Sequence, residues 1–244
     1  MSDEQAILLS DIFPTGYQAA EMAQIRPGDV VCVLGCGPVG QFAIWSALHL
    51  GAGRVIAVDS VPDRLSTARN QGAEIVDFGH EDPVDLVKEM TRGIGPDRVI
   101  DAVGVDANAG ARPASPSVEH AQDDTPERVP PGSGWHPGEA PSEAARWAVE
   151  MVAKAGTVSL IGVYPPTVEH FPIGQAFMKN VSLNMGNCNH RRYLPMLLEL
   201  VRSGAVSPTD FIAQRHPMES AAEAFRTFER REPGWLKVEL RPVA

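Results

Sequence analysis

The sequence predicts an α/β protein built on a doubly wound, parallel sheet, followed by tail elements that look like parts of a second domain. Two patterns predict the sheet. Short apolar runs alternate with helical segments from residue 30 onward, and the first run leads directly into a glycine-rich turn that opens a helix. Right-handed crossovers between parallel strands then favour the strand order 3-2-1-4-5-6.

The elements follow from this alternation in chain order. Strands are expected at 30–34, 54–58, 74–77, 98–103, 157–163 and 180–185. Helices are expected after the glycine turn and at 63–71, 83–90 and 141–154. The tail from His216 onward carries an amphipathic helix, with Ala221, Ala224, Phe225 and Phe228 at helical spacing, and a last strand is expected at 235–240. Neither tail element is needed by the six-stranded sheet.

The glycine-rich turn is the strongest functional signal in the chain. Each glycine has its own mechanical role: Gly35 lets the chain turn out of the strand, Gly37 lets the backbone approach a pyrophosphate, and Gly40 allows close packing of helix on strand. The N-terminus of the helix then offers free N–H groups and a positive dipole end to phosphates. This pattern predicts a Rossmann-type dinucleotide site.

Asp59 closes the second strand about 20 residues after the glycines, where such sites place the acid that binds a ribose. A carboxylate at this position accepts hydrogen bonds from the ribose hydroxyls and repels a 2′-phosphate. The sequence therefore favours NAD over NADP as cofactor. The alternative interpretation is an ordinary strand-turn-helix unit whose terminal Asp has no ligand.

Composition and charge narrow the class of protein. The chain has 244 residues, 43% of them hydrophobic, a formal net charge of -10 and three cysteines. An acidic chain of this kind disfavours nucleic-acid and anionic-membrane partners, which require clustered Lys and Arg. No apolar stretch approaches the roughly 20 residues of a membrane span, and the acidic start lacks the apolar core of a signal peptide. We expect a cytoplasmic protein with reduced thiols.

The alternating pattern stops between the fourth strand and the helix at 141–154. Many prolines are mixed there with small and charged residues. We expect a mobile insert at 105–140, which leaves the carboxyl end of the fourth strand, where ligands bind in such sheets. A lid over the cofactor and a connection without function are both consistent with this composition.

Four blocks of sequence resemble the medium-chain, zinc-dependent alcohol dehydrogenases, and most of all their glutathione-independent formaldehyde dehydrogenase branch. The blocks are Leu-Ser-Asp-Ile-Phe-Pro-Thr-Gly-Tyr at 9–17, the glycine turn with its acid, Ile-Gly-Val-Tyr at 161–164 and Gly-Asn-Cys-Asn-His-Arg at 186–191. The resemblance covers nearly the whole chain but includes no counterpart of the family's N-terminal GroES-like catalytic domain. It implies remnants of that domain with a linker at 1–29, an NAD-binding domain at 30–203 and a further remnant at 204–244.

The resemblance implies a metal ligand and a catalytic position in the first block. Asp11 matches the third zinc ligand of this branch, and Thr15 matches a threonine near the nicotinamide. A catalytic zinc normally has three protein ligands, so zinc is expected only if the missing domain is supplied. As alternatives, Asp11 is the N-cap of the following helix and Thr15 is a helix-start residue.

The remaining cofactor residues are also implied by the resemblance. Pro38 and Val39 lie against the cofactor, with Val39 behind the nicotinamide ring, and Arg64 reaches the same ribose as Asp59. The other matched positions are Val103 on the adenine side, Ile161 and Val163 on the carboxamide side, Gly186 and Cys188 near the nicotinamide, and Lys237 at the pyrophosphate. Lys237 is equally well explained as a solvent-facing lysine of a strand.

Two histidines invite a functional role but have simpler interpretations. His190 follows Asn189 at the start of an apolar-periodic run, so a capped helix is favoured over a metal site. Arg191 and Arg192 in that first turn face either the cofactor phosphates or an acidic neighbour. His49 lies in an apolar helix and is expected to be buried in the core.

These observations favour the NAD-binding portion of a zinc-dependent alcohol or aldehyde dehydrogenase, which transfers a hydride between a small alcohol or aldehyde and NAD. The alternative is a stand-alone NAD-binding module without catalytic activity. A methyltransferase shares the strand, the turn and the acid, but Pro38 and Val39 and the matching tail disfavour it. A homo-oligomer formed through the sixth strand, as in dimers of the resembled family, is a further expectation.

Overall fold

The computed structural model describes residues 1–107, 140–166 and 171–242. The expected insert at 105–140 therefore falls almost entirely outside the described residues. Within these ranges, every helix is too short or too polar to cross a lipid bilayer.

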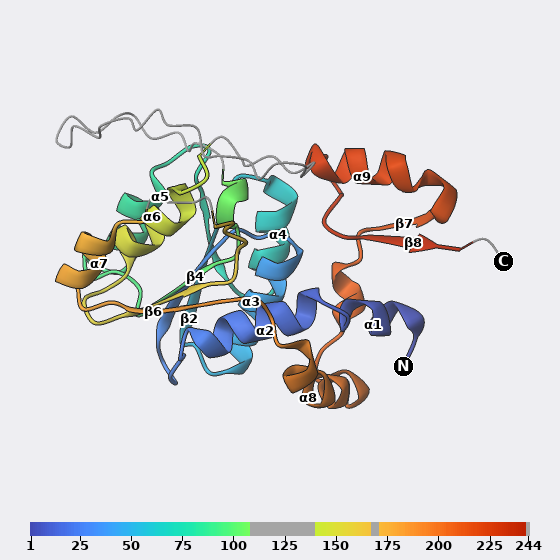
Figure 1. Ribbon diagram of the computed structural model, residues 1–244, viewed down its shortest axis with the longest axis horizontal. Coiled ribbons are helices and arrows are strands. Elements are labelled where there is room, and N and C mark those ends of the chain that lie inside the picture. Colours follow the sequence, from blue (N-terminus) through green and yellow to red (C-terminus); the bar gives the residue numbers. More distant parts are fainter. Residues whose placement is uncertain (108–139, 167–170, 243–244) are drawn as a thin grey trace.

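The centre of the molecule is a six-stranded parallel sheet in the order β3-β2-β1-β4-β5-β6, which confirms the predicted order and fold class (Figure 1). Its strands are β1 Val30–Leu34, β2 Arg54–Asp59, β3 Glu74–Asp77, β4 Arg98–Asp101, β5 Thr157–Leu160 and β6 Ser182–Met185. Because all six run parallel, their carboxyl ends meet at one edge.

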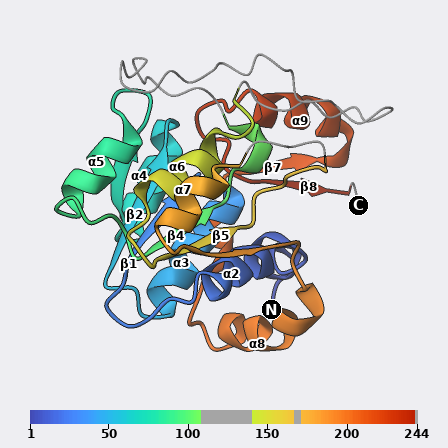
Figure 2. The same ribbon diagram turned by 60° about the vertical axis from the view of Figure 1, so that its left-hand side comes forward.

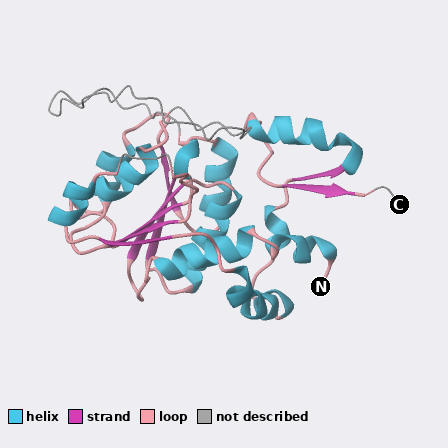
Figure 3. Ribbon diagram, viewed as in Figure 1, coloured by secondary structure: helices cyan, strands magenta, loops and turns pink. Residues whose placement is uncertain are grey.

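Helices cover both faces of the sheet, as Figure 3 shows. Those connected with the sheet are α2 Ile12–Met22, α3 Pro38–His49, α4 Pro62–Asn70, α5 Pro83–Met90, α6 Glu143–Met151 and α7 Ile173–Met178. Apolar side chains of α2, α3 and α4 pack on one face, and those of α5 and α6 pack on the other. Burial of the inner strands β1, β2, β4 and β5 on both faces explains why most of their residues are apolar rather than alternating.

A third apolar cluster joins segments from both ends of the chain (Figure 2). It brings α1 Asp3–Leu8, the start of α2, α8 His190–Arg202 and the short 3-10 helix η2 Pro208–Phe211 against α3. Phe42 of α3 is its centre, because the ring stacks on Phe13 at 4.6 Å and lies 4.7 Å from Phe211. The segments outside the sheet are thus packed onto it through one aromatic core.

The tail forms a small second sheet that the sequence only partly predicts. Strand β7 Gln214–Pro217 pairs with β8 Val238–Arg241 and is followed by the 3-10 helix η3 Met218–Ser220 and by α9 Ala221–Glu229. The expected tail helix is α9, which contains Ala221, Ala224, Phe225 and Phe228. His216, at the start of the tail, lies in β7, and the strand expected at 235–240 begins at Val238. β7 was missed because its four residues Gln-Arg-His-Pro show neither apolar alternation nor β-branched side chains.

Three strands of the main sheet are shorter than predicted, and local hydrogen bonds explain two of the ends. Strand β4 ends at Asp101 rather than at 103, because the Asp101 carboxylate accepts hydrogen bonds from the N–H groups of Val103 and Gly104 at 2.8 and 3.0 Å. Strand β5 ends at Leu160 because the next two N–H groups both donate to the Asp101 carbonyl. Strand β6 begins at Ser182, after Asn180 with a φ of 54°.

We predict that Gly40→Ala destabilises the fold by about 1–3 kcal/mol or more, because the added Cβ would lie 1.9 Å from the Gly35 carbonyl oxygen. Denaturant unfolding monitored by circular dichroism measures the change. Gly174→Ala in α7 is the matched control, since nothing lies within 4 Å of its added Cβ. Equal stability of the two variants would show that helix α3 does not pack against the turn as described.

Candidate functional site

The edge formed by the carboxyl ends of the strands gathers most of the residues predicted from the sequence. Gly35 follows β1, Asp59 ends β2, Val103 follows β4, Ile161 and Val163 follow β5, and Gly186 follows β6. Ile161 is buried, Val103 is partly buried, and Val163 is 66% exposed. This edge is where open α/β sheets bind ligands.

Two glycines of the turn have no room for a side chain. Gly35 has a φ of +85°, and a Cβ there would lie 2.6 Å from the Val103 Cγ2 atom. A Cβ on Gly40 would overlap the Gly35 carbonyl oxygen at 1.9 Å. The tight turn and the close packing of helix on strand therefore both require glycine.

Gly37 differs from Gly35 and Gly40 because a side chain at Gly37 would point into open space. A Cβ on Gly37 would meet only one atom within 4 Å, the Nη1 atom of Arg64 at 3.7 Å. Gly37 is also the N-cap of α3, with no side-chain capping bond, and Pro38 and Val39 beside it are partly exposed. The first N–H groups of a 12-residue helix thus face an open position beside a guanidinium.

The Asp59 carboxylate holds this turn in place. Its Oδ2 atom accepts a hydrogen bond from the Cys36 N–H at 2.7 Å, and its Oδ1 atom accepts from the N–H groups of Ser60 and Val61 at 2.8 and 2.9 Å. The residue is only 6% exposed. Asp59 therefore ties the end of β2 to the glycine turn in addition to the ribose contact expected from the sequence.

Arg64 lies beside Asp59 with an incompletely paired guanidinium. Its Nη1 atom is 4.0 Å from Asp59 Oδ2, and its side chain is 13% exposed. Burial lowers the pKa of Arg64, and the attraction of Asp59 opposes this effect. Within the described ranges the guanidinium donates no hydrogen bond, so several N–H donors are available to an acceptor in the open space.

Gln41 was missed by the sequence analysis, although it fixes the position of Arg64. It is fully buried in α3, and its Nε2 atom donates to the carbonyl oxygens of Cys36 at 2.8 Å and Arg64 at 2.9 Å. Its own oxygen accepts from Gln71 at 2.6 Å. One amide thus connects the glycine turn with the first turn of α4. A polar residue in an otherwise apolar helix was the available signal.

Asp101 was also missed, and it shapes the neighbouring loop. The residue is fully buried at the end of β4, and Tyr164 donates a hydrogen bond to its Oδ2 atom at 2.6 Å. Burial raises the pKa of Asp101, while the hydrogen bonds from Tyr164, Gly104 and Val103 oppose the rise. The loops after β4 and β5 touch here, since a Cβ on Gly162 would lie 2.1 Å from the Gly104 nitrogen.

A second polar cluster surrounds Asp11 at the start of α2. Thr15 donates a hydrogen bond to Asp11 Oδ1 at 2.9 Å, and His190 Nε2 lies 3.0 Å from the same oxygen. Asp11 occupies the N-cap position of α2, but its side chain makes no capping hydrogen bond. Burial raises the pKa of Cys188; a hydrogen bond with Thr15 opposes this rise, and the charge of Asp11 adds to it. Burial lowers the pKa of Lys237, and the attraction of Asp11 opposes this decrease.

Gln18, a third residue missed from the sequence, clamps the segment after β6 onto α2. Its Nε2 atom donates to the Asn187 carbonyl at 2.9 Å, and its Oε1 atom accepts from the Asn189 N–H at 2.8 Å. Because Cys188 lies between these two residues, the clamp sets Cys188 and His190 beside Asp11. Gly186, at the start of the segment, is exposed with a φ of 146°.

The histidine expectations need correction. His49 is exposed rather than buried, and its ring stacks on Trp45 at 4.7 Å, because position 49 lies on the outer side of α3. His190 does begin a helix, but Asn189 makes no side-chain capping bond and the ring of His190 contacts Asp11. The acidic neighbour expected for Arg192 is Glu21, at 2.9 Å.

The Asp11 cluster does not by itself complete a zinc site. Over residues 1–107, 140–166 and 171–242, no three His, Cys, Asp or Glu side chains are placed to hold one metal ion. A catalytic zinc normally takes three protein ligands. The donors present are too few, so no chemical step is assigned to a metal on these residues.

The sheet order, the glycine turn and the acid after β2 define a dinucleotide-binding protein of Rossmann type. A family profile described as "Zinc-binding dehydrogenase" matches residues 38–111. This match begins at α3 and includes β2, α4, β3, α5 and β4.

Individual relatives match almost the whole chain. The uncharacterized zinc-type alcohol dehydrogenase-like protein AdhB of Bacillus subtilis is 35% identical over 242 residues, which are 98% of this chain and 60% of the relative. An NADP-dependent isopropanol dehydrogenase of Entamoeba histolytica is 43% identical over 102 residues, or 41% of this chain and 28% of the relative.

Solved structures of alcohol dehydrogenases have the same fold. The alcohol dehydrogenase TADH from Thermus sp. ATN1 is 31% identical, with a TM-score of 0.80 over 100% of this chain and 61% of the other. An NAD-dependent alcohol dehydrogenase is 26% identical, with a TM-score of 0.73, and the match covers 100% of this chain and 60% of the other. The chain is similar over nearly its whole length to zinc-type alcohol dehydrogenase-like proteins, and it spans about 60% of the length of AdhB and of TADH.

We predict that Asp59→Ala lowers the free energy of unfolding by about 1–3 kcal/mol, because it leaves buried N–H groups of the turn without an acceptor. Denaturant titration measures the loss. The exposed Glu89 supplies a control, since Glu89→Ala is expected to change stability by less than about 0.5 kcal/mol. If Asp59→Ala is as stable as this control, the carboxylate does not hold the turn.

We also predict a pH dependence from Asp101, whose pKa in the folded state lies above its ordinary value of 3.8. The folded chain then binds this proton more tightly than the unfolded chain. The resulting stabilisation is complete below pH 3.8 and is lost as the pH rises through the folded pKa. The stability of wild type relative to Asp101→Asn should fall across this window in denaturant titrations. A relative stability that rises with pH would contradict the account.

Proposed function

We propose that this chain is the NAD-binding portion of a zinc-type alcohol or aldehyde dehydrogenase that transfers a hydride between a small alcohol or aldehyde and NAD. The observation that supports it best is the open position at Gly37, where a Cβ would meet only the guanidinium of Arg64. An anion placed there faces both a helix N-terminus and a cation. A pyrophosphate has the charge and size for this position.

NAD is proposed rather than NADP because a carboxylate stands at the end of β2. Three backbone N–H groups occupy part of the accepting capacity of Asp59, and a carboxylate offers about four lone-pair sites. The remaining capacity would accept a ribose hydroxyl, while the negative charge repels a 2′-phosphate. Both cofactors are named among the similar proteins, NAD for one solved structure and NADP for the isopropanol dehydrogenase, so the proposal rests on Asp59.

The other cofactor contacts are proposals that rest on the resemblance and on position at the sheet edge. Pro38 and Val39 line the start of α3, and Val103, Ile161 and Val163 line the loops after β4 and β5. Gly186 and Cys188 follow β6, where the Gln18 clamp holds the backbone beside Thr15. These positions suit the nicotinamide end of the cofactor, with Thr15 as the candidate catalytic residue.

Zinc is proposed only for an assembly that adds further ligands. Asp11 would supply one carboxylate ligand, but the described residues lack the remaining donors. We also propose that the chain is related to the formaldehyde dehydrogenase branch. Its proposed division is a remnant of the catalytic domain with a linker at 1–29, an NAD-binding domain at 30–203 and a further remnant at 204–244. Self-association through β6 is proposed as well, since Phe177, Met178 and Met185 nearby are exposed to 79, 78 and 58%.

The incomplete donor set around Asp11 also supports a second candidate, a module that binds NAD without turning it over. The two functions share the site at Gly37 and differ in chemistry. Formation of NADH from NAD and an alcohol by the purified chain with added zinc supports the dehydrogenase. Binding of NAD without such turnover supports the module.

We predict that Gly37→Val abolishes NAD binding without unfolding the protein, because the new side chain enters the open position and its Cβ would meet only Arg64 Nη1, at 3.7 Å. Isothermal titration calorimetry measures binding, and circular dichroism measures folding. Gly174→Val, in α7 on the other face of the sheet, is the control and should bind like wild type. A folded Gly37→Val protein that binds NAD normally would place the cofactor elsewhere.

A further inference from the structure

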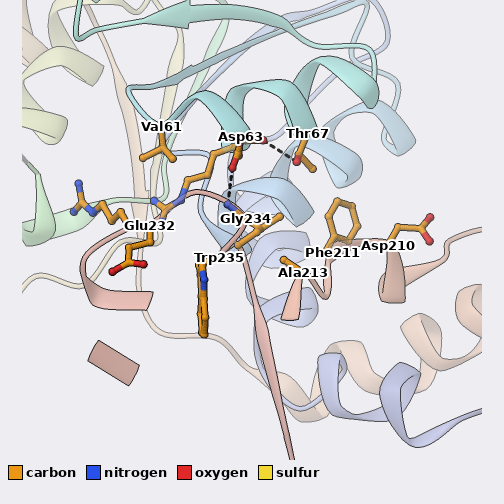
Figure 4. Close-up of a pocket in the computed structure, with 12 residues that line it drawn as sticks. Val61, Asp63, Thr67, Asp210, Phe211, Ala213, Glu232, Gly234 and Trp235 are labelled. Atoms are coloured by element: carbon orange, nitrogen blue, oxygen red, sulfur yellow. Dashed lines mark hydrogen bonds between the residues drawn. The ribbon is translucent and has the colours of Figure 1, made fainter. Parts of the chain in front are cut away.

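A cavity of about 150 Å³ lies between α4 and the C-terminal segment, next to the glycine turn. Figure 4 shows Val61, Asp63 and Thr67 of the first turns of α4 on one side, and Gly234 and Trp235 on the other. The Gly234 N–H donates to the Asp63 carboxylate at 2.5 Å, which joins the two walls. Two arginines, Arg64 and Arg231, also line the cavity.

Arg231 reaches this wall from the turn after α9. It is half-buried, with a φ of 55°, and its Nη2 atom donates to the Asp106 carbonyl oxygen at 3.2 Å. Among the described residues, no carboxylate oxygen lies within 4 Å of its guanidinium. Arg231 therefore brings a positive charge to the cavity, and its partner outside the cavity is Asp106, through the backbone carbonyl and the charge of the carboxylate.

The two guanidinium groups repel each other. Burial lowers the pKa of Arg64, Asp59 opposes this effect, and the nearby charge of Arg231 adds to it. The carboxylates that line the cavity have other partners: Asp63 accepts from Gly234, Asp210 accepts from Ser207, and Glu232 lies 3.7 Å from Arg230. Two incompletely paired cations beside a helix N-terminus favour an anion with several acceptor oxygens.

We propose that Arg231, together with Arg64, binds a phosphate group of the dinucleotide. This inference rests on the proposed cofactor function and adds to it a residue that neither the resemblance nor the sequence pattern indicated. Lys237, the basic residue expected at the pyrophosphate, has Asp11 as its charged neighbour, whereas the neighbours of Arg231 are Arg64 and Asp106. The C-terminal segment thus contributes a cation at the wall of α4.

The phosphate could come from either of two parts of a nicotinamide dinucleotide. The pyrophosphate is common to NAD and NADP, whereas the 2′-phosphate is present in NADP alone. Arg64 contacts the position left open at Gly37 and also lies beside Asp59, so it is within reach of both. The chemistry of recognition is the same in the two cases, and binding measurements with both dinucleotides separate them.

The test compares Arg231→Gln with Arg230→Gln by calorimetry, using NAD, NADP and uncharged adenosine. Arg230 is the matched control because its side chain is 69% exposed and pairs with Glu232. We expect Arg231→Gln to weaken dinucleotide binding roughly tenfold or more, and Arg230→Gln to leave it unchanged. Adenosine, which has no phosphate, should bind both variants equally.

The pattern of loss identifies the phosphate. Equal weakening of NAD and NADP indicates the pyrophosphate, and weakening of NADP alone indicates the 2′-phosphate. Wild-type affinity should also depend more steeply on salt than that of Arg231→Gln, which provides a second readout. Unchanged dinucleotide binding by folded Arg231→Gln, while wild type binds, would overturn this inference alone. A wild-type chain that binds neither dinucleotide would overturn the proposed function with it.

Discussion

The hydrogen bond from the Cys36 N–H to Asp59 is the interaction on which the candidate site depends. It joins the end of β2 to the turn after β1, and so determines where the first N–H groups of α3 point. Gln41 adds a second connection from the other side of the turn, to the carbonyl oxygens of Cys36 and Arg64. Buried polar groups of this kind are costly unless they are paired, so the hydrogen bonds of Asp59 and Gln41 favour one arrangement of the turn and of the first turn of α4.

Buried polar side chains also hold the loops at the other end of the sheet edge. Asp101 fixes the loop after β4, and Gln18 fixes the segment after β6 against α2. The aromatic cluster around Phe42 packs the N- and C-terminal segments onto α3. These two segments carry Asp11 and Arg231. The candidate site is thus formed by loops that rigid, apolar layers hold in position.

Periodicity and glycine spacing predicted the sheet, its strand order and the turn, because these depend on patterns that are local in the sequence. Gln18 was not predicted, since its partners Asn187 and Asn189 lie far along the chain and meet it only after folding. Gln41 and Asp101 bond partly to nearby backbone, but their links to Arg64 and to Tyr164 also exist only in the folded chain. The contact of the His190 ring with Asp11 was missed for the same reason. The sequence predicted that Asp59 binds a ribose, whereas its hydrogen bond with the Cys36 N–H is seen only in the structure.

The similar proteins and the geometry of the site both favour a dinucleotide as the ligand. The position at which it binds on this chain can be measured. The most direct measurement is a titration of the ¹⁵N-labelled protein with NAD, followed through the amide resonances of the turn and of the start of α3. The account predicts that the largest shifts occur at Gly37, Val39 and Gly40, with further changes at Ser60 and Val61, where N–H groups share the Asp59 carboxylate. Saturable shifts confined to another part of the chain, with these five amides unmoved, would contradict it.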